Sequence, residues 1–508
     1  MKFGDIAKRN DSDQWMKAVN EEMNSLKRNE TWSLVERPSN RAVITCKWIF
    51  SRKRNAAGEL ETYKARLVAR GFTQREGFDF NETYSPVAKI TTVRLLLALA
   101  VERDLEIHQM DVKTAFLNGK LEEDIYMEQP DGFVQGKLVC KLNKSLYGLK
   151  QASRVWNERF HTFVVRIGFL RSQYDQCLYL MGSGASMILL LLYVDDLILL
   201  GKNLDKILIV KRLIAAEFEM RDMGEIKTFL GINIQRNRDA GTLYLSQRKY
   251  LEDVLRRFNM NNCNPVATPM EIQTKKITRS ESEFTKKPYR ELIGCLMYIA
   301  YATRPDLCAA VGYFSQFQSC ATDEHWIGAK RILRYVKSSL DLRLLYNCHY
   351  KSPVLEGFAD ADYGSESNER KSISGNIIKV FGSTVGWTAR KQTSVALSTT
   401  ESEYISLAIA AAEIIWYRGI LCEIGISLDG PTIIHEDNQG AIKIALGEKV
   451  SQRTKHIDIK YHFIRDCIEK QIINLRYIKT QEQQADIMTK GLSKNVFQYI
   501  CKKIGLVN

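Results

Sequence analysis

The segment MILLLLYVDDLILLG, from Met187 to Gly201, places two adjacent aspartates, Asp195 and Asp196, inside an apolar run. An ionised carboxylate buried without a partner is costly, and two neighbouring ones repel each other. A membrane span broken by a polar pair is one interpretation. However, its uninterrupted part, 187–194, is far shorter than the roughly 20 residues that a spanning helix needs. The segment therefore predicts two short core strands joined by a tight turn, with both carboxylates at its tip.

The carboxylates at this tip need a positive partner, which is either a buried Lys or Arg or a divalent cation. Residues 187–201 contain no Lys or Arg, which favours a metal ion and a further carboxylate from elsewhere in the chain. Asp111 is a candidate for that carboxylate, because it ends an apolar strand pattern in IHQMDVKTAF. The helix and strands expected between the two segments allow their strands to be neighbours.

The composition favours a large protein with a polyanionic partner. The chain has 508 residues, enough for three domains of roughly 150 residues each. Its 73 basic and 59 acidic residues give a net charge of +14, which suggests nucleic acid, although an ordinary basic surface is the alternative. Eleven cysteines without a CxxC pair indicate a reducing compartment rather than zinc knuckles or disulfides. The start, MKFGDIAKRNDSDQW, lacks an apolar signal region, and no membrane partner is expected.

Hydrophobic periodicity predicts mixed helices and strands. Residues 41–80 predict a basic hairpin with its turn near NAAGE, and the polar residues 261–285 predict a linker or an extended segment. Beyond residue 351 the order strand, strand, strand, helix, strand, helix predicts a separate α/β domain. Further helices are expected over 152–169, 204–220, 286–340 and 91–104, the last with Thr91 or Thr92 as its N-cap.

A second set of acidic residues follows residue 351. Asp360 and Asp362 end a strand in LEGFADADYG, Asp437 follows a strand in TIIHEDNQGAI, and Asp486 lies on a last helix in QQADIMTKGL. Glu401 opens a helix in LSTTESEY, where it also matches an S-x-x-E capping box, so a helix cap is its alternative role. Carboxylates gathered from separate elements are typical of a site for two Mg²⁺ ions.

Several motifs resemble one family over much of the chain. LLYVDDLILLG resembles the catalytic hairpin of reverse transcriptases. Three longer segments resemble the fingers and palm of copia-type (Pseudoviridae) LTR-retrotransposon Pol polyproteins: DVKTAFLNGKLEEDIYMEQPDGF, KSLYGLKQASRVWN and KARLVARGFTQREGFDFNETYSPVAKITTVR. Four short motifs resemble the ribonuclease H of these elements: ADADYG, LSTTESEY, DNQGAI and ADIMTKGL.

The resemblance implies an α+β multidomain fold, in which a right-hand polymerase of fingers, palm and thumb precedes an α/β ribonuclease H-like domain. The implied boundaries are 1–40 for an N-terminal lead segment, 41–260 for fingers and palm, 261–350 for thumb or connection, and 351–508 for the ribonuclease H-like domain.

The resemblance also implies metal ligands. In the polymerase, Asp111, Asp195 and the backbone carbonyl of Val112 would bind metal, and Asp196 would complete the catalytic cluster. Each site would hold two Mg²⁺ ions, with Mn²⁺ as a substitute. In the ribonuclease H-like domain, the implied catalytic metal ligands are Asp360, Glu401, Asp437 and Asp486, with Asp362 in a capping or supporting role.

Nucleotide-binding residues are implied in the same way. Phe116 matches the gate that excludes a 2′-hydroxyl, with an ordinary core aromatic as the alternative. Gly148 and Gln151 in YGLKQA fall where the nucleotide and template are contacted. Three basic residues are candidates for binding the triphosphate, although a solvated hairpin face explains them equally and the choice among them stays open: Lys64, Arg66 and Arg70.

The segment RYIKTQEQQAD departs from many ribonucleases H, because it has no histidine shortly before its aspartate. His456 and His462 lie upstream and are expected to be structural. A zinc site would need a further matching pair of Cys or His residues, and the sequence has none.

The implied function is RNA- and DNA-directed DNA polymerisation with hybrid-specific RNA cleavage, both by two-metal phosphoryl transfer. The expected partners are an RNA template, a DNA primer, an RNA–DNA hybrid and dNTPs, and the oligomeric state stays open. The expected location is intracellular and cytoplasmic, in a virus-like particle, with a nuclear step as an option. The alternative is a truncated, non-catalytic nucleic-acid-binding remnant, because no protease or integrase motif precedes these segments.

Overall fold

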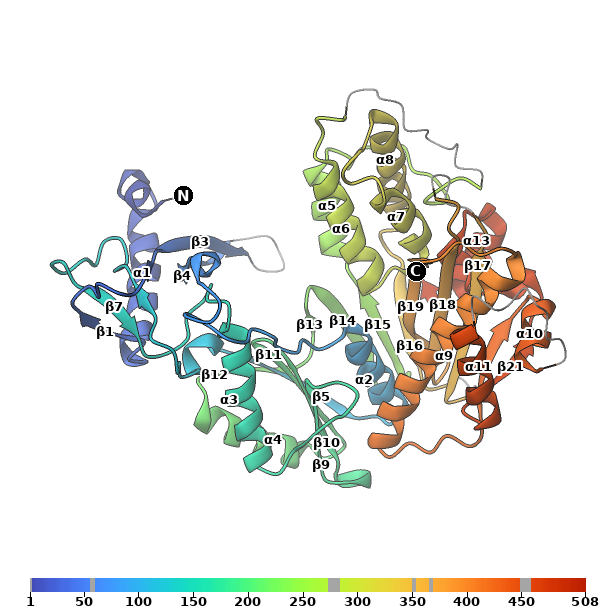
Figure 1. Ribbon diagram of the computed structural model, residues 1–508, viewed down its shortest axis with the longest axis horizontal. Coiled ribbons are helices and arrows are strands. Elements are labelled where there is room, and N and C mark those ends of the chain that lie inside the picture. The colour runs from blue at the N-terminus through green and yellow to red at the C-terminus, as the bar shows by residue number, and fades with distance from the viewer. Residues whose placement is uncertain (1, 55–59, 273–283, 350–352, 365–368, 448–457) are drawn as a thin grey trace.

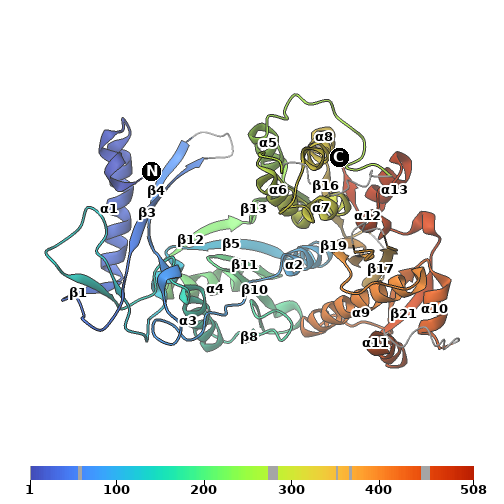
Figure 2. The same ribbon diagram turned by 45° about the horizontal axis from the view of Figure 1, so that its top comes forward.

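The computed structural model describes residues 2–54, 60–272, 284–349, 353–364, 369–447 and 458–508. These residues form a mixed α+β structure with five β-sheets (Figure 1). The N-terminal hairpin β3–β4 and the helices α5 to α8 lie on either side of a central six-stranded sheet (Figure 2). The C-terminal sheet and its helices lie beyond α2.

The N-terminal part combines a long helix, a hairpin and a small sheet around one core. α1 (Ser12–Arg28) buries its apolar face, including Trp15, against the hairpin. The hairpin itself is confirmed as β3 (Cys46–Arg54) and β4 (Leu60–Ala69), while its expected turn, 55–59, lies outside the described residues. The small sheet has the order β1-β7-β6-β2, with strands Trp32–Val35, Val139–Leu142, Tyr126–Met127 and Val43–Ile44.

The six-stranded sheet contains the segment that opened the sequence analysis. Its predicted hairpin is confirmed, because β10 (Ile188–Tyr193) pairs with β11 (Asp196–Gly201) in antiparallel register. β11 also pairs with β5 (Glu106–Val112), so that Asp196 lies opposite Asp111, as the predicted neighbouring strands require. The other strands are β12 (Met220–Glu225), β9 (Leu178–Met181) and β8 (Leu170–Arg171), in the order β12-β5-β11-β10-β9-β8.

Helices cover both faces of this sheet. Leu190 and Leu192 of β10 share a core with α3 (Ala152–Arg166) and α4 (Leu204–Glu217). Leu189 and Leu191 belong to the core that contains α2 (Ile90–Glu102). Alternate side chains of a strand point to opposite faces, so a strand buried on both faces reads as one continuous apolar run. This burial explains the composition of MILLLLYV without any membrane.

The start of α2 corrects one prediction. The helix begins at Ile90 with Lys89 as its N-cap, so neither expected threonine caps it. The Thr92 hydroxyl instead donates a hydrogen bond of 2.5 Å to the buried Asp175 carboxylate. A tertiary acceptor has therefore replaced the local capping bond that the sequence suggested.

A five-stranded antiparallel sheet links the central and C-terminal parts. Its order is β13-β14-β15-β16-β22, with strands Thr228–Phe229, Ile232–Asn237, Thr242–Ser246, Arg343–Asn347 and Leu506–Val507. The last strand comes from the end of the chain and pairs with β16. The neighbouring helices are α5 (Arg248–Arg257), α6 (Tyr289–Ala302), α7 (Cys308–Ser315) and α8 (Asp323–Ser338).

The C-terminal sheet has the order β19-β18-β17-β20-β21. β17 (Leu355–Asp362), β18 (Ile373–Val380) and β19 (Ser383–Lys391) form an antiparallel meander, and β20 (Thr432–Glu436) and β21 (Ile473–Tyr477) add in parallel. The order of elements predicted after residue 351 is confirmed. The helices are α9 (Thr399–Glu423), α10 (Gln439–Ala445), α11 (Asp458–Glu469), α12 (Asp486–Thr489) and α13 (Lys494–Lys503).

Among the described residues, one helix, α9, is long and apolar enough to cross a membrane, by length and composition alone. Its buried side chains contact β17, β18 and β20 of the C-terminal sheet. This packing accounts for its apolar composition, as it does for the core helix of an α/β layer.

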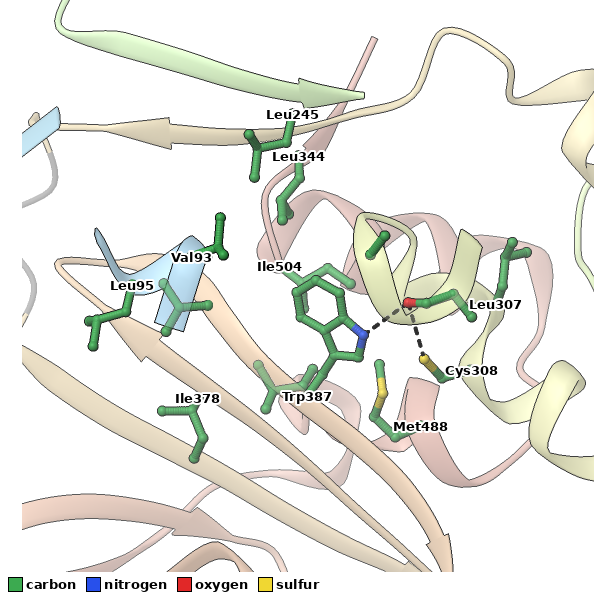
Figure 3. Close-up of a cluster of buried hydrophobic side chains, with 14 of the residues drawn as sticks. Val93, Leu95, Leu245, Leu307, Cys308, Leu344, Ile378, Trp387, Met488 and Ile504 are labelled. Atoms are coloured by element: carbon green, nitrogen blue, oxygen red, sulfur yellow. Dashed lines mark hydrogen bonds between the residues drawn. The ribbon is translucent and has the colours of Figure 1, made fainter. Parts of the chain in front are cut away.

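One hydrophobic core runs from the six-stranded sheet to the C-terminal sheet. Figure 3 shows its centre, where Val93 of α2, Leu344 of β16 and Ile378 of β18 surround Trp387 of β19. The Trp387 indole donates a hydrogen bond of 3.0 Å to the backbone carbonyl of Ala300 in α6. The sheets are therefore joined by packed side chains as well as by the connecting chain.

Arg94 on α2 crosses this core and is 2% exposed. It donates hydrogen bonds to the carbonyls of Val385 (2.8 Å), Tyr301 (2.6 Å) and Ala302 (3.1 Å). Its guanidinium also lies 3.5 Å from the centre of the Trp387 ring. Burial lowers the pKa of Arg94 from its usual value, but the fixed donors satisfy three carbonyls from two different parts of the chain.

Replacing Arg94 by methionine should destabilise the chain by about 2–3 kcal/mol, because the buried carbonyls lose their donors while the side-chain length is nearly kept. Urea unfolding measures the difference. The control is Arg103→Met, which removes an exposed arginine at the end of the same helix and should change stability by less than about 0.5 kcal/mol. Equal midpoints for the two variants would contradict the role of Arg94.

Candidate active sites

The turn between β10 and β11 is held from two sides. Val194 has a φ of 57°, a left-handed conformation that costs a β-branched residue about 1–3 kcal/mol. The buried Trp156 indole donates a hydrogen bond of 2.6 Å to the Val194 carbonyl. The Val112 amide donates one of 2.8 Å to the Asp195 carbonyl. These bonds fix the turn, and with it the position of the Asp195 side chain beside β5.

Asp111, Val112 and Asp195 line one cavity of about 390 Å³ at this end of the sheet. Two of the three basic candidates, Lys64 and Arg66, line it as well, from β4 of the hairpin. The structure thus brings acidic and basic residues to the lining of one cavity, which is the combination of charges that a metal–phosphate ligand needs.

Two predicted residues lie beside this group rather than in it. Asp196 is opposite Asp111 in the strand register, and its carboxylate accepts a hydrogen bond of 3.2 Å from the Gln109 side chain. Arg70 is exposed at the end of β4, beyond the residues that line the cavity. The Asp196 carboxylate therefore bonds to a neighbouring strand of the sheet. Arg70 stays a predicted triphosphate ligand, but it does not line the cavity.

Tyr147 was missed by the sequence analysis. It lines the cavity, its ring lies edge-on to Phe116 with centroids 4.8 Å apart, and the Arg66 guanidinium is 4.6 Å from the ring centre. Burial and the nearby Asp195 and Asp111 carboxylates raise the pKa of Tyr147 to about 12 against the opposing charge of Arg66. The phenol therefore stays neutral and can donate a hydrogen bond in this cavity.

Phe116 lies in the short helix η3 (Ala115–Asn118), which follows β5 directly. The ring is half-buried and packs against Tyr147, so it lies next to the wall of the acidic cavity. This position suits both the gate and the core aromatic that the sequence left open.

Gly148 has a φ of 92°, and a Cβ there would lie 2.1 Å from the carbonyl oxygen of Ala69. Close approach of β4 therefore explains the glycine. Gln151, which stays a predicted nucleotide-site residue, has a side chain that is 1% exposed and bonded internally. It accepts a hydrogen bond of 3.0 Å from Gln74 and donates one of 2.9 Å to the Asp79 carbonyl. These bonds tie the loop before α2 to the start of α3.

The second acidic site lies at the ends of β17 and β20. Oxygen atoms of Asp360, Glu403 and Asp437 lie within 4.8 Å of one another. Asp486, at the start of α12, is close enough to Asp360 for the two carboxyl groups to share a hydrogen bond. The Thr489 hydroxyl also donates to Asp360. Asp362 ends the same strand as Asp360 and is half-buried.

Glu401 is a second correction, because the carboxylate that α9 contributes to this group is Glu403. Residues two positions apart on a helix are rotated by about 200° around its axis, so the side chains of Glu401 and Glu403 point to opposite faces of α9. Glu401 instead accepts a hydrogen bond of 2.7 Å from the Leu397 amide, and the Ser398 hydroxyl accepts one of 3.2 Å from the Glu401 amide. The helix-start role that the sequence offered as an alternative is the one the structure gives Glu401.

The second site is more acidic than the sequence indicated. Glu436, next to Asp437, is fully buried, and burial together with Asp437 and Asp360 raises its pKa well above the usual value. Burial and the surrounding carboxylates raise the pKa of Glu403 to about 11, and burial and Asp360 raise that of Asp486 to about 8. Such groups ionise together only when a cation neutralises them.

A divalent metal fits the side chains of this second site. The Oε2 atoms of Glu403 and Glu436 are buried and have no hydrogen-bond partner within the described residues. Clustered carboxylate oxygens with free lone pairs are the ligands that Mg²⁺ and Mn²⁺ prefer. Of the two upstream histidines, His462 is exposed on α11, and His456 lies outside the described residues.

The sequence matches a family model described as reverse transcriptase (RNA-dependent DNA polymerase) over residues 29–272. The chain is 42% identical over 505 residues to the Pol polyprotein from transposon TNT 1-94 of Nicotiana tabacum, with 97% of this chain aligned. It spans only 38% of that polyprotein's length. It is 31% identical over 311 residues to a putative transposon Ty5-1 protein of Saccharomyces cerevisiae. This alignment covers the whole of the yeast protein and 60% of this chain.

Among solved structures, the foamy viral protease-reverse transcriptase in complex with double-stranded DNA aligns with 92% of this chain and 70% of its own. The TM-score is 0.44 at 10% identity.

Proposed function

Because the chain belongs to the reverse transcriptase family of copia-type LTR retrotransposons, we propose that it is an RNA- and DNA-directed DNA polymerase that also cleaves the RNA strand of RNA–DNA hybrids. The single observation that carries the proposal is the cavity that Asp111 and Asp195 line together with Lys64 and Arg66. Its substrates would be an RNA or DNA template, a DNA primer and dNTPs.

The domain assignment belongs to this proposal. The hairpin and small sheet with α1 would be the fingers, the six-stranded sheet with α2 to α4 the palm, and α5 to α8 the thumb and connection. The C-terminal sheet would be the ribonuclease H-like domain. The assignment is supported by an acidic group at the strand ends of each of the two sheets.

In polymerisation, this chain's residues would position the reacting groups. Asp111, Asp195 and the Val112 carbonyl would hold two Mg²⁺ ions, which supply activation of the primer hydroxyl and stabilisation of the leaving oxygen. Lys64 and Arg66 would bind the triphosphate oxygens, since fixed cations suit phosphate. Tyr147 and Phe116 would form the wall against the sugar of the incoming nucleotide.

In hybrid cleavage, Asp360, Glu403, Asp437 and Asp486 would hold the metal ions, with Glu436 as a buried neighbouring charge. Specificity for the RNA strand would come from 2′-hydroxyl contacts in the wide minor groove.

All eleven cysteines are free thiols, which supports the proposed location in a reducing, intracellular compartment and, on the family's pattern, in a cytoplasmic particle.

Two variants test whether the chain has two separate active sites. Asp195→Asn should lower primer extension on a primed RNA template by about 10³-fold or more, while hybrid cleavage survives. Glu403→Gln should do the reverse. Both activities are measured with Mg²⁺ on the full chain. The controls are Asp205→Asn, an exposed aspartate on α4, and Glu401→Gln, two residues away on α9, and both should stay within a few-fold of the unmodified chain.

Loss of both activities in both variants would contradict two independent sites. Loss of cleavage in Glu401→Gln but not in Glu403→Gln would restore the assignment made from the sequence. A chain that binds hybrid but shows neither activity before substitution would be the non-catalytic remnant.

Phe116→Ala should raise the ratio of ribonucleotide to deoxyribonucleotide incorporation by about 10- to 100-fold, because the wall against the 2′-hydroxyl is removed. The ratio of kcat/KM for matched rNTP and dNTP measures it. Phe133→Ala, which removes a half-buried ring that packs near Trp48, is the matched control and should leave the ratio unchanged. Unchanged sugar selectivity in Phe116→Ala would refute the gate.

A further inference from the structure

A lysine lies inside the second acidic site. Lys490 directly follows α12, and its ammonium is 2.9 Å from the Asp486 carboxylate and 3.6 Å from that of Asp360. Both carboxylates are almost fully buried, whereas the lysine side chain is 33% exposed. The ammonium therefore reaches in from the surface on a flexible stem to two groups that would bind metal.

Charge explains why the ammonium lies there. Asp360, Glu403, Glu436, Asp437 and Asp486 crowd into one site, where their negative charges repel one another. The Lys490 ammonium places a positive charge beside two of these carboxylates.

We propose that Lys490 is the built-in counter-ion of the second acidic site and competes with a divalent cation for Asp360 and Asp486. The inference rests on the proposed metal-binding function of this site. A divalent ion carries twice the charge and takes several carboxylate oxygens at once, so it displaces the ammonium. The partly exposed stem lets the ammonium swing outward into solvent without unfolding α12.

The competition gives the side chain two measurable consequences. Without metal, Lys490 stabilises the folded chain by offsetting carboxylate repulsion. With metal, it weakens the apparent affinity, because the ammonium must first leave. A permanent structural ion pair would give the first consequence without the second.

The test is a thermal-shift titration with Mg²⁺ on the full chain, with Asp111→Asn and Asp195→Asn present to silence the first site. In this background, Lys490→Met should lower the metal-free melting temperature and reduce the Mg²⁺ concentration for half-maximal stabilisation by about tenfold. Lys490→Arg keeps the charge and should keep the midpoint within about threefold. Lys490→Gln also removes the charge and should lower the Mg²⁺ midpoint in the same direction, so it tests the competition if the methionine variant folds poorly.

Lys470→Met is the matched control. Lys470 pairs with Asp466 at the same i, i+4 spacing and the same 2.9 Å, but on the surface at 63% exposure. It should change neither the melting temperature nor the Mg²⁺ midpoint.

A Mg²⁺ midpoint for Lys490→Met equal to or higher than that of the parent would overturn the competition while leaving the metal site intact. A parent chain that gains no stability from Mg²⁺, and that Asp437→Asn does not alter, would overturn the metal site and the role of Lys490 together.

Discussion

Repulsion between carboxylates at the ends of buried strands is the constraint that the rest of this structure satisfies. Asp111 and Asp195 share one cavity, and Asp360, Glu403 and Asp437 bring oxygen atoms within 4.8 Å of one another. Such groups separate or take up protons unless the backbone holds them and cations neutralise them. Each is therefore carried on, or directly beside, a strand or helix whose other side chains lie in a packed apolar core. The rigidity of those elements provides the position, and on the proposed function the cations would provide the charge.

The continuous core sets how the two acidic sites relate. α2 packs against β16 and β19, and Arg94 bonds carbonyls of both α6 and β19. The last strand, β22, returns from the end of the chain to pair with β16. The distance between the two sites is therefore fixed by packed elements rather than by a linker. On the proposed function, this fixes the length of duplex between polymerisation and cleavage.

Local patterns in the sequence predicted the elements well and the side-chain partners less well. The YVDD hairpin and its neighbouring strand followed from apolar runs and a polar break, which are local signals. The internal bonds of Gln151 and the cap of α2 were not predicted, because their distant partners, Asp79 and Asp175, were not visible in the sequence. Glu403 had a signal that was passed over: it is in phase with the buried Leu407, Ala410 and Ile414 of α9, whereas Glu401 was already explained as part of a helix start. The three-carbonyl site of Arg94 depends on tertiary packing and had no local signal.

Anomalous diffraction from crystals of the full chain soaked in Mn²⁺ tests the central claim most directly, because it locates the cations without relying on activity. The account predicts Mn²⁺ peaks in two separate places, one between Asp111 and Asp195 and one among Asp360, Glu403 and Asp437. Glu401 should lie outside the coordination sphere. Peaks at only one of these places, or bound Mn²⁺ that Glu401 coordinates and Glu403 does not, would contradict it.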